Sequence, residues 1–78
     1  MAQIEWRTIK KIDKDRNTIH CKVQVTYSVF EIDGQKYFQI DTYGKSDREI
    51  PGKISQTIQL DKECAKFLVE KLRKEFDL

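Results

Sequence analysis

Residues 23–43 read VQVTYSVFEIDGQKYFQIDTY, and this stretch decides the fold. Two runs rich in β-branched and aromatic residues flank the dipeptide Asp33-Gly34, which is typical of a two-residue type I′ hairpin turn. Such a turn fixes the register of two antiparallel strands, predicted over 18–32 and 35–43. It pairs Ile32 with Gln35, Glu31 with Lys36, Phe30 with Tyr37, Val29 with Phe38, Tyr27 with Ile40, and Val25 with Thr42. A slip of one residue would exchange the two faces of the hairpin.

The predicted register gives the hairpin two unlike faces. One face is apolar and is expected to lie in the core; it carries Val23, Val25, Tyr27, Val29, Phe38, Ile40 and Thr42. The other face is polar with three embedded rings; it carries Lys22, Gln24, Thr26, Ser28, Phe30, Tyr37, Gln39, Asp41 and Tyr43. A sheet face that only meets water needs no aromatic rings, so the polar face is the candidate functional surface.

Outside the hairpin we expect two further strands and one helix. A strand over 3–12 precedes the hairpin, and a strand over 53–60 with alternating apolar residues follows it. The helix is predicted over 62–76, because Asp61 is a suitable N-cap and apolar residues recur with helical spacing at Ala65, Leu68, Val69, Leu72 and Phe76. The expected fold is α+β, a four-stranded antiparallel sheet with one face covered by a C-terminal helix.

The composition bounds the class of protein. A chain of 78 residues forms one domain, and its small hydrophobic share of 38% suggests that a second copy completes the core. No apolar run is long enough to cross a bilayer, and the N-terminus lacks the pattern of a signal peptide. Cys21 and Cys64 follow no metal-ligand spacing and are interpreted as reduced, buried side chains, which favours a cytoplasmic protein.

We expect no enzymatic activity, no cofactor and no metal. The chain has one histidine, His20, and its neighbour Cys21 points to the opposite face of any strand that contains both. No phosphate-binding glycine motif, paired-histidine metal site or Ser/His/Asp set can be assembled from the sequence. His20 is therefore interpreted as an ordinary surface residue.

The polar face has the features of a surface that binds unpaired bases. Such a surface needs aromatic planes for stacking, hydrogen-bonding amides, and cations for the phosphates. Phe30, Tyr37 and Tyr43 supply rings and Gln39 supplies an amide, while the candidate cations are Lys22, Lys45, Arg48 and Lys53. The net charge of +2 is modest, and Asp41 would repel phosphate unless it accepts a base amino group or pairs with a lysine. The alternative is that the rings only stabilise the sheet as cross-strand pairs.

Three stretches of the second half also form a pattern: KYFQIDTY at 36–43, IPGK at 50–53, and IQLD at 58–61 before the helix. Together they resemble the PC4-like (transcriptional coactivator p15) single-stranded DNA-binding family. The resemblance implies a curved sheet, the element order β-β-β-β-α, and a homodimer that binds single strands without strong sequence preference. By position it implicates Tyr37, Gln39, Tyr43 and Lys53. The chain differs from the family pattern in lacking the basic run that usually follows the Pro-Gly, and a cation on the third strand.

The leading hypothesis is a non-enzymatic homodimer that binds single-stranded nucleic acid, with DNA preferred to RNA, in transcription or in DNA replication or repair. We expect the dimer interface on the helix, at Phe67, Leu68, Leu72 and Phe76. Two rival hypotheses remain open. One is a protein-interaction module of the same fold, and the other is a binder of small nucleotides that uses the same rings and cations.

Overall fold

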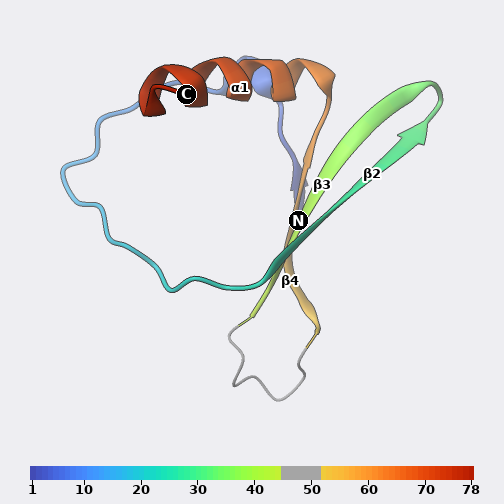
Figure 1. Ribbon diagram of the computed structural model, residues 1–78, viewed down its shortest axis with the longest axis horizontal. Helices are drawn as coiled ribbons and strands as arrows, with labels where there is room; N and C mark the ends of the chain where they lie inside the picture. Colours follow the sequence, from blue (N-terminus) through green and yellow to red (C-terminus); the bar gives the residue numbers. More distant parts are fainter. Residues whose placement is uncertain (45–51) are drawn as a thin grey trace.

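The computed structural model describes residues 1–44 and 52–78 and has an α+β fold. A four-stranded mixed sheet is followed by one C-terminal helix (Figure 1). The elements in chain order are β1 (Ala2–Gln3), the 3-10 helix η1 (Trp6–Thr8), β2 (Val25–Ile32), β3 (Gln35–Tyr43), β4 (Ile54–Leu60) and α1 (Lys62–Phe76). The order of strands across the sheet is β1-β4-β3-β2, so β2 lies at one edge.

The hairpin of β2 and β3 has the predicted register. Ile32 lies opposite Gln35, and all the other predicted pairs, up to Val25 and Thr42, are confirmed. The turn residues have φ angles of 53° at Asp33 and 77° at Gly34, as a type I′ turn requires. The turn sequence therefore sets which side chains lie on each face of the sheet.

The prediction of a wholly antiparallel sheet is wrong, because β1 pairs with β4 in parallel. The strand expected over 3–12 is also much shorter and covers only Ala2 and Gln3. Local polar contacts replace the strand: the Glu5 side chain accepts a hydrogen bond from the Arg7 backbone N–H, and the Thr8 hydroxyl donates to the Glu5 carbonyl. These contacts favour the 3-10 turn of η1 over an extended ladder.

The strand predicted to begin at residue 18 begins instead at Val25. Its partner β3 ends at Tyr43, whose backbone N–H donates to the Gln24 carbonyl at 3.0 Å. Before Gln24, none of the described strands pairs with the chain, and residues 10–24 lie outside the sheet without regular structure (Figure 1). Cys21 lies in this segment and is exposed, which corrects the expectation that both cysteines are buried.

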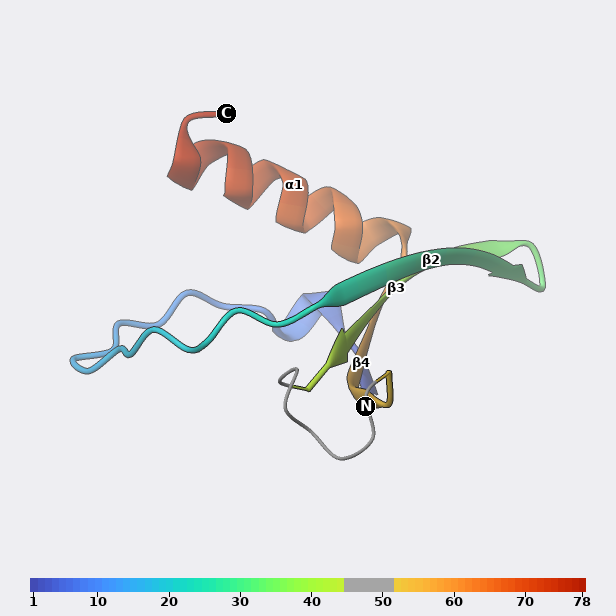
Figure 2. The same ribbon diagram turned by 60° about the horizontal axis from the view of Figure 1, so that its bottom comes forward.

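The helix α1 has the predicted bounds. The Asp61 side chain caps it by accepting a hydrogen bond from the Cys64 backbone N–H at 2.8 Å, and the left-handed Asp77 ends it. Cys64 is fully buried, and this burial, with the nearby Asp61 carboxylate, raises the pKa of its thiol. Figure 2 shows α1 rising away from the sheet toward its C-terminus, so the helix does not cover the hairpin.

The expected core face of the hairpin is therefore open. Val25, Tyr27 and Val29 expose 53%, 68% and 53% of their surface, and Val23 is also exposed. Among the residues that the structure describes, only Cys64 and Asp41 are buried. Contiguous exposed apolar surface of this kind is typical of sites that interact with another surface.

The turn gives a direct test of the hairpin geometry. Gly34→Ala is expected to lower the free energy of unfolding by about 1 kcal/mol, because alanine is disfavoured at a φ of 77°. No heavy atom lies within 4 Å of a Cβ built at this position, so the loss comes from the backbone and not from a clash. Urea denaturation measures the change. The control Asp33→Asn should change stability by less than about 0.5 kcal/mol, because asparagine tolerates positive φ. An unchanged Gly34→Ala variant would contradict the assigned turn.

Candidate nucleic-acid interface

The polar face is built by three neighbouring strands. Alternation along each strand places on one side the side chains of Thr26, Ser28, Phe30, Tyr37, Gln39, Asp41, Tyr43, Thr57 and Gln59, which define the polar face below. The pairs Gln39–Gln59 and Asp41–Thr57 join β3 to β4 across this face. Four of these residues, Phe30, Tyr37, Gln39 and Tyr43, were predicted from the sequence as binding residues.

Two of the predicted rings form a pair at the turn end of the hairpin. The rings of Phe30 and Tyr37 stack with centroids 5.5 Å apart and an interplanar angle of 24°. Both side chains are half-buried, and the Tyr37 hydroxyl donates to Gln35 Oε1 at 2.9 Å. The pair is both a cross-strand contact that stabilises the sheet and an aromatic platform with further ring surface open to a ligand.

The third ring lies at the other end of β3. A bulge between Thr42 and Tyr43 shifts the register there, and the Tyr43 hydroxyl lies 3.0 Å from Thr26 Oγ1, within hydrogen-bond distance. This contact keeps Tyr43 on the polar face. Six residues of extended chain separate Tyr37 from Tyr43, which corresponds to about 20 Å. The three rings therefore provide two separate stacking positions and not one continuous stack.

A chain of side-chain hydrogen bonds fills the space between the rings. Gln59 Nε2 donates to Gln39 Oε1 at 2.8 Å, and Gln39 Nε2 donates to both carboxylate oxygens of Asp41 at 3.1 and 3.2 Å. Thr57 Oγ1 donates to Asp41 Oδ1 at 2.7 Å. We call these four residues the Asp41 network. The register of β4 against β3, which the sequence did not reveal, brings them together.

The predicted cations lie at the margin of the polar face or outside the described residues. Lys22 precedes β2 and Lys53 precedes β4, and both are exposed. Lys45 and Arg48 belong to residues 45–51, which the structure does not describe. Within the described strands, Asp41 is the only Asp, Glu, Lys or Arg on the polar face. The centre of this face is thus suited to neutral, hydrogen-bonding and stacking groups.

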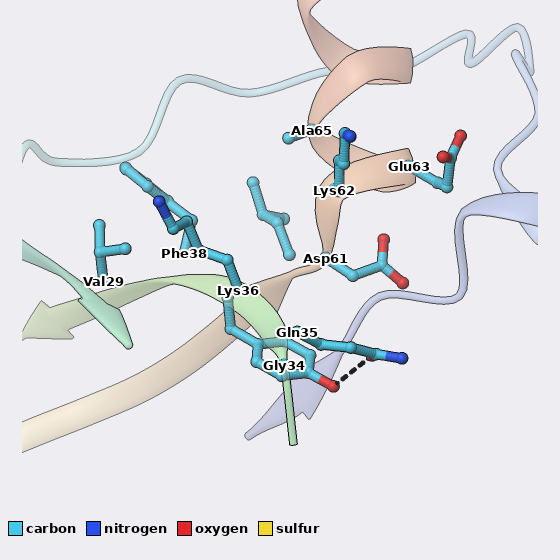
Figure 3. A pocket seen from close by; sticks show the side chains of 11 residues that line it. Val29, Gly34, Gln35, Lys36, Phe38, Asp61, Lys62, Glu63 and Ala65 are labelled. Carbon is cyan, nitrogen blue, oxygen red and sulfur yellow. Dashed lines mark hydrogen bonds between the residues drawn. The ribbon is translucent and has the colours of Figure 1, made fainter. Parts of the chain in front are cut away.

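The opposite face of the hairpin carries a ring pair that the sequence placed in the core. Tyr27 stacks on Phe38 with centroids 4.9 Å apart and an interplanar angle of 12°. Beside this pair, a cavity of about 780 Å³ opens between the hairpin and the first turn of α1 (Figure 3). Its apolar lining is Val29, Phe38, Leu60 and Ala65, with polar side chains such as Lys36 and Glu63 around them, and Tyr37 also borders it. We call this cavity the apolar groove.

The helix turns only part of its apolar surface toward its own chain. Phe67 packs against Trp6 of η1 with ring centroids 6.3 Å apart, and Lys71 Nζ lies 5.3 Å from the Phe67 centroid. Leu72 and Phe76 expose 49% and 69% of their surface, and the nearby Val69 and Leu78 are also exposed. Of the four predicted interface residues, Leu72 and Phe76 therefore have the exposure that an interface requires. Phe67 and Leu68 are half-buried.

Comparisons with known proteins add no assignment. No protein-family model matches the chain, and no curated protein or solved structure matches it. No helix in the described part of the chain has the length and apolarity to cross a membrane. Residues 1–44 and 52–78 also contain no group of three His, Cys, Asp or Glu side chains placed to hold a metal ion. The candidate surfaces are thus the polar face and the apolar groove.

The Asp41 network makes a testable contribution to stability. Thr57→Val removes one of the donors to the buried Asp41 carboxylate and is expected to lower the free energy of unfolding by about 1–3 kcal/mol. Thr26→Val is the matched control, because among the described residues the Thr26 hydroxyl contacts the Tyr43 hydroxyl alone, at an exposed position. The Thr26→Val substitution should lower the free energy of unfolding by less than about 1 kcal/mol. Equal losses in the two variants, measured by urea denaturation, would contradict a special role for the buried carboxylate.

Proposed function

We propose that the protein is a non-enzymatic homodimer that binds single-stranded nucleic acid on the polar face, with DNA preferred to RNA. The observation that carries this proposal is the location of Phe30, Tyr37 and Tyr43 on one sheet face, with amides and hydroxyls between them. Aromatic rings beside such groups are the means by which proteins stack and contact unpaired bases. In this proposal Lys22 and Lys53 contact the phosphates at the margins, together with Lys45 and Arg48.

The proposed family is PC4-like. Support comes from the β-β-α order of β3, β4 and α1, from the open polar face, and from the sequence resemblance of residues 36–43, 50–53 and 58–61. The parallel pairing of β1 differs from the antiparallel sheet that the resemblance implies. The proposed roles are transcription or DNA replication or repair in the cytoplasm, a setting in which free cysteines such as Cys21 and Cys64 persist.

The proposed homodimer accounts for the small core. The chain exposes 7487 Å², whereas a compact monomer of this length exposes about 5,000 Å². Its radius of gyration is 14.9 Å, against about 11.5 Å for a compact chain of 78 residues. Part of the excess lies in the extended residues 10–24. In the proposed homodimer, an uncovered interface contributes to this excess, since obligate homodimers bury about 1,000–2,500 Å² of each subunit.

A second copy is the proposed occupant of the apolar groove. Val29 of β2, Phe38 of β3 and Ala65 of α1 line this groove, and further exposed apolar side chains lie on β2 and α1. The same two elements in a partner chain carry an identical apolar surface. A two-fold arrangement therefore buries the apolar surfaces of both copies against each other. The interface then includes Val25, Tyr27 and Val69 as well as Leu72 and Phe76.

Ring substitutions test the binding role. Tyr37→Ala and Tyr43→Ala are each expected to weaken binding of labelled oligo-dT by about 1–3 kcal/mol, because each removes a stacking surface. Ile32→Ala is the matched control: Ile32 is an exposed, non-aromatic side chain of β2, opposite Gln35 near the Phe30–Tyr37 pair. Its affinity should stay within about twofold of the wild type. Fluorescence anisotropy gives the affinities, and circular dichroism confirms that each variant is folded.

The same variants separate the rival functions. Folded, dimeric ring variants with unchanged oligonucleotide affinity would overturn the proposal. If the variants instead unfold or dissociate, the rings have a structural role, as expected for a protein-interaction module. Competition by mononucleotides as effective as by oligomers would indicate a binder of small nucleotides that uses the same rings.

The dimer has its own test. Val69→Asp places a charge in the exposed apolar surface of α1 and is expected to shift the protein toward monomer in sedimentation equilibrium. Glu70→Ala is the control and should remain dimeric, because Glu70 is exposed on the helix and forms no ion pair with another described residue. The thermal midpoint of the wild type should also rise with protein concentration, because association stabilises the folded state. A monomeric wild type with a concentration-independent midpoint would contradict the proposed dimer.

A further inference from the structure

The centre of the polar face carries a charge of the same sign as a phosphate. Asp41 exposes only 8% of its surface, and its carboxylate accepts hydrogen bonds from Gln39 and Thr57. No Lys, Arg or His within the described ranges lies within 4 Å of this carboxylate. Because burial reduces solvent screening, a charge at this position acts on a ligand over a distance of several ångströms without touching it.

The charge of Asp41 dominates the electrostatic potential at the centre of the polar face, because its neighbours there are neutral. Its neighbours on the polar face are an amide at Gln39, hydroxyls at Thr26 and Thr57, and the ring of Tyr43. Of the predicted cations, the two with a described position precede strands: Lys53 comes directly before β4, and Lys22 comes three residues before β2. A phosphate is therefore attracted at the margin of the face and repelled at its centre, whereas an uncharged base is not repelled.

The direction of the hydrogen bonds in the Asp41 network also favours a base over a phosphate. A carboxylate accepts and does not donate, so Gln39 must turn its NH₂ group toward Asp41 and its oxygen toward Gln59. Gln59 consequently gives one N–H to Gln39, and its own Oε1 is left as an acceptor. A base edge carries donors that can satisfy this oxygen, whereas a phosphodiester carries acceptors only.

We propose that Asp41 is a specificity-determining residue that makes the polar face select unpaired bases and reject duplex nucleic acid. A single strand can turn its bases toward Asp41 and Gln59 and leave its phosphates at the margin. A duplex presents phosphates along its outer surface, and these meet the Asp41 charge at the centre of the face. This inference rests on the proposed function. It attributes the preference for single-stranded over duplex nucleic acid to one side chain.

The test compares one single strand with the duplex that it forms with its complement, at low and constant salt. Asp41→Asn removes the charge and is expected to tighten duplex binding roughly fivefold, the effect of one charge at about 8 Å in a medium between water and protein interior. Single-strand affinity should change by less than about twofold. Ser28→Lys is the second variant: it adds a cation opposite Gln39 at an exposed position and leaves the Asp41 network intact. It should tighten duplex binding by a similar factor.

Glu31→Gln is the control, because it removes one carboxylate charge from an exposed position on the opposite face of the hairpin. Its ratio of single-strand to duplex affinity should equal that of the wild type. The inference is overturned if neither Asp41→Asn nor Ser28→Lys lowers this ratio, or if Glu31→Gln lowers it as much as they do. A wild-type protein that binds neither probe would instead overturn the proposed function itself, so the two failures are distinguishable.

Discussion

The left-handed backbone at Asp33 and Gly34 is the constraint on which the rest of the structure depends. These two residues fix the register of β2 against β3, and that register separates the polar side chains from the valines. It places Phe30 opposite Tyr37 and centres Asp41 on the polar face. A one-residue slip would move every one of these side chains to the other face, so the candidate binding surface exists only in this register.

The second consequence of this register is an apolar face that the chain does not cover by itself. The helix contacts its own chain through Cys64 and Phe67, which leaves Leu72 and Phe76 exposed. Burial of apolar surface contributes roughly 25 cal/mol per Å², so an open face of this kind forgoes much of the free energy that stabilises a small domain. In the proposed homodimer, the second copy restores that contribution.

Sequence reasoning succeeded where the determinants were local. The turn dipeptide and the helical spacing after Asp61 predicted β3 and α1 at their observed bounds. It failed where the outcome depended on distant partners. Residues 4–12 have apolar content suited to a strand, yet β1 covers Ala2 and Gln3 and its contact with β4 ends at Ile4, whose backbone N–H donates to the Gln59 carbonyl. Beyond that point, Glu5 and Thr8 stabilise a 3-10 turn.

The candidate site shows the same division. Alternation placed Tyr37 and Gln39 on the polar face correctly, because alternation needs only the hairpin register. The Asp41 network also needs the register of β4 against β3, and no turn signal in the sequence fixes it across the long loop between these strands. The exposure of Tyr27 was likewise not predictable, because it depends on how far α1 leans from the sheet.

The central claim is that the polar face binds single strands through base stacking at its centre and phosphate contacts at its margin. Titration of labelled oligo-dT over a series of salt concentrations tests it most directly. The account predicts clear binding at low salt, with the logarithm of the association constant falling by about 0.7 per phosphate contact for each tenfold rise in salt. Absence of binding at the lowest salt concentration would contradict the account.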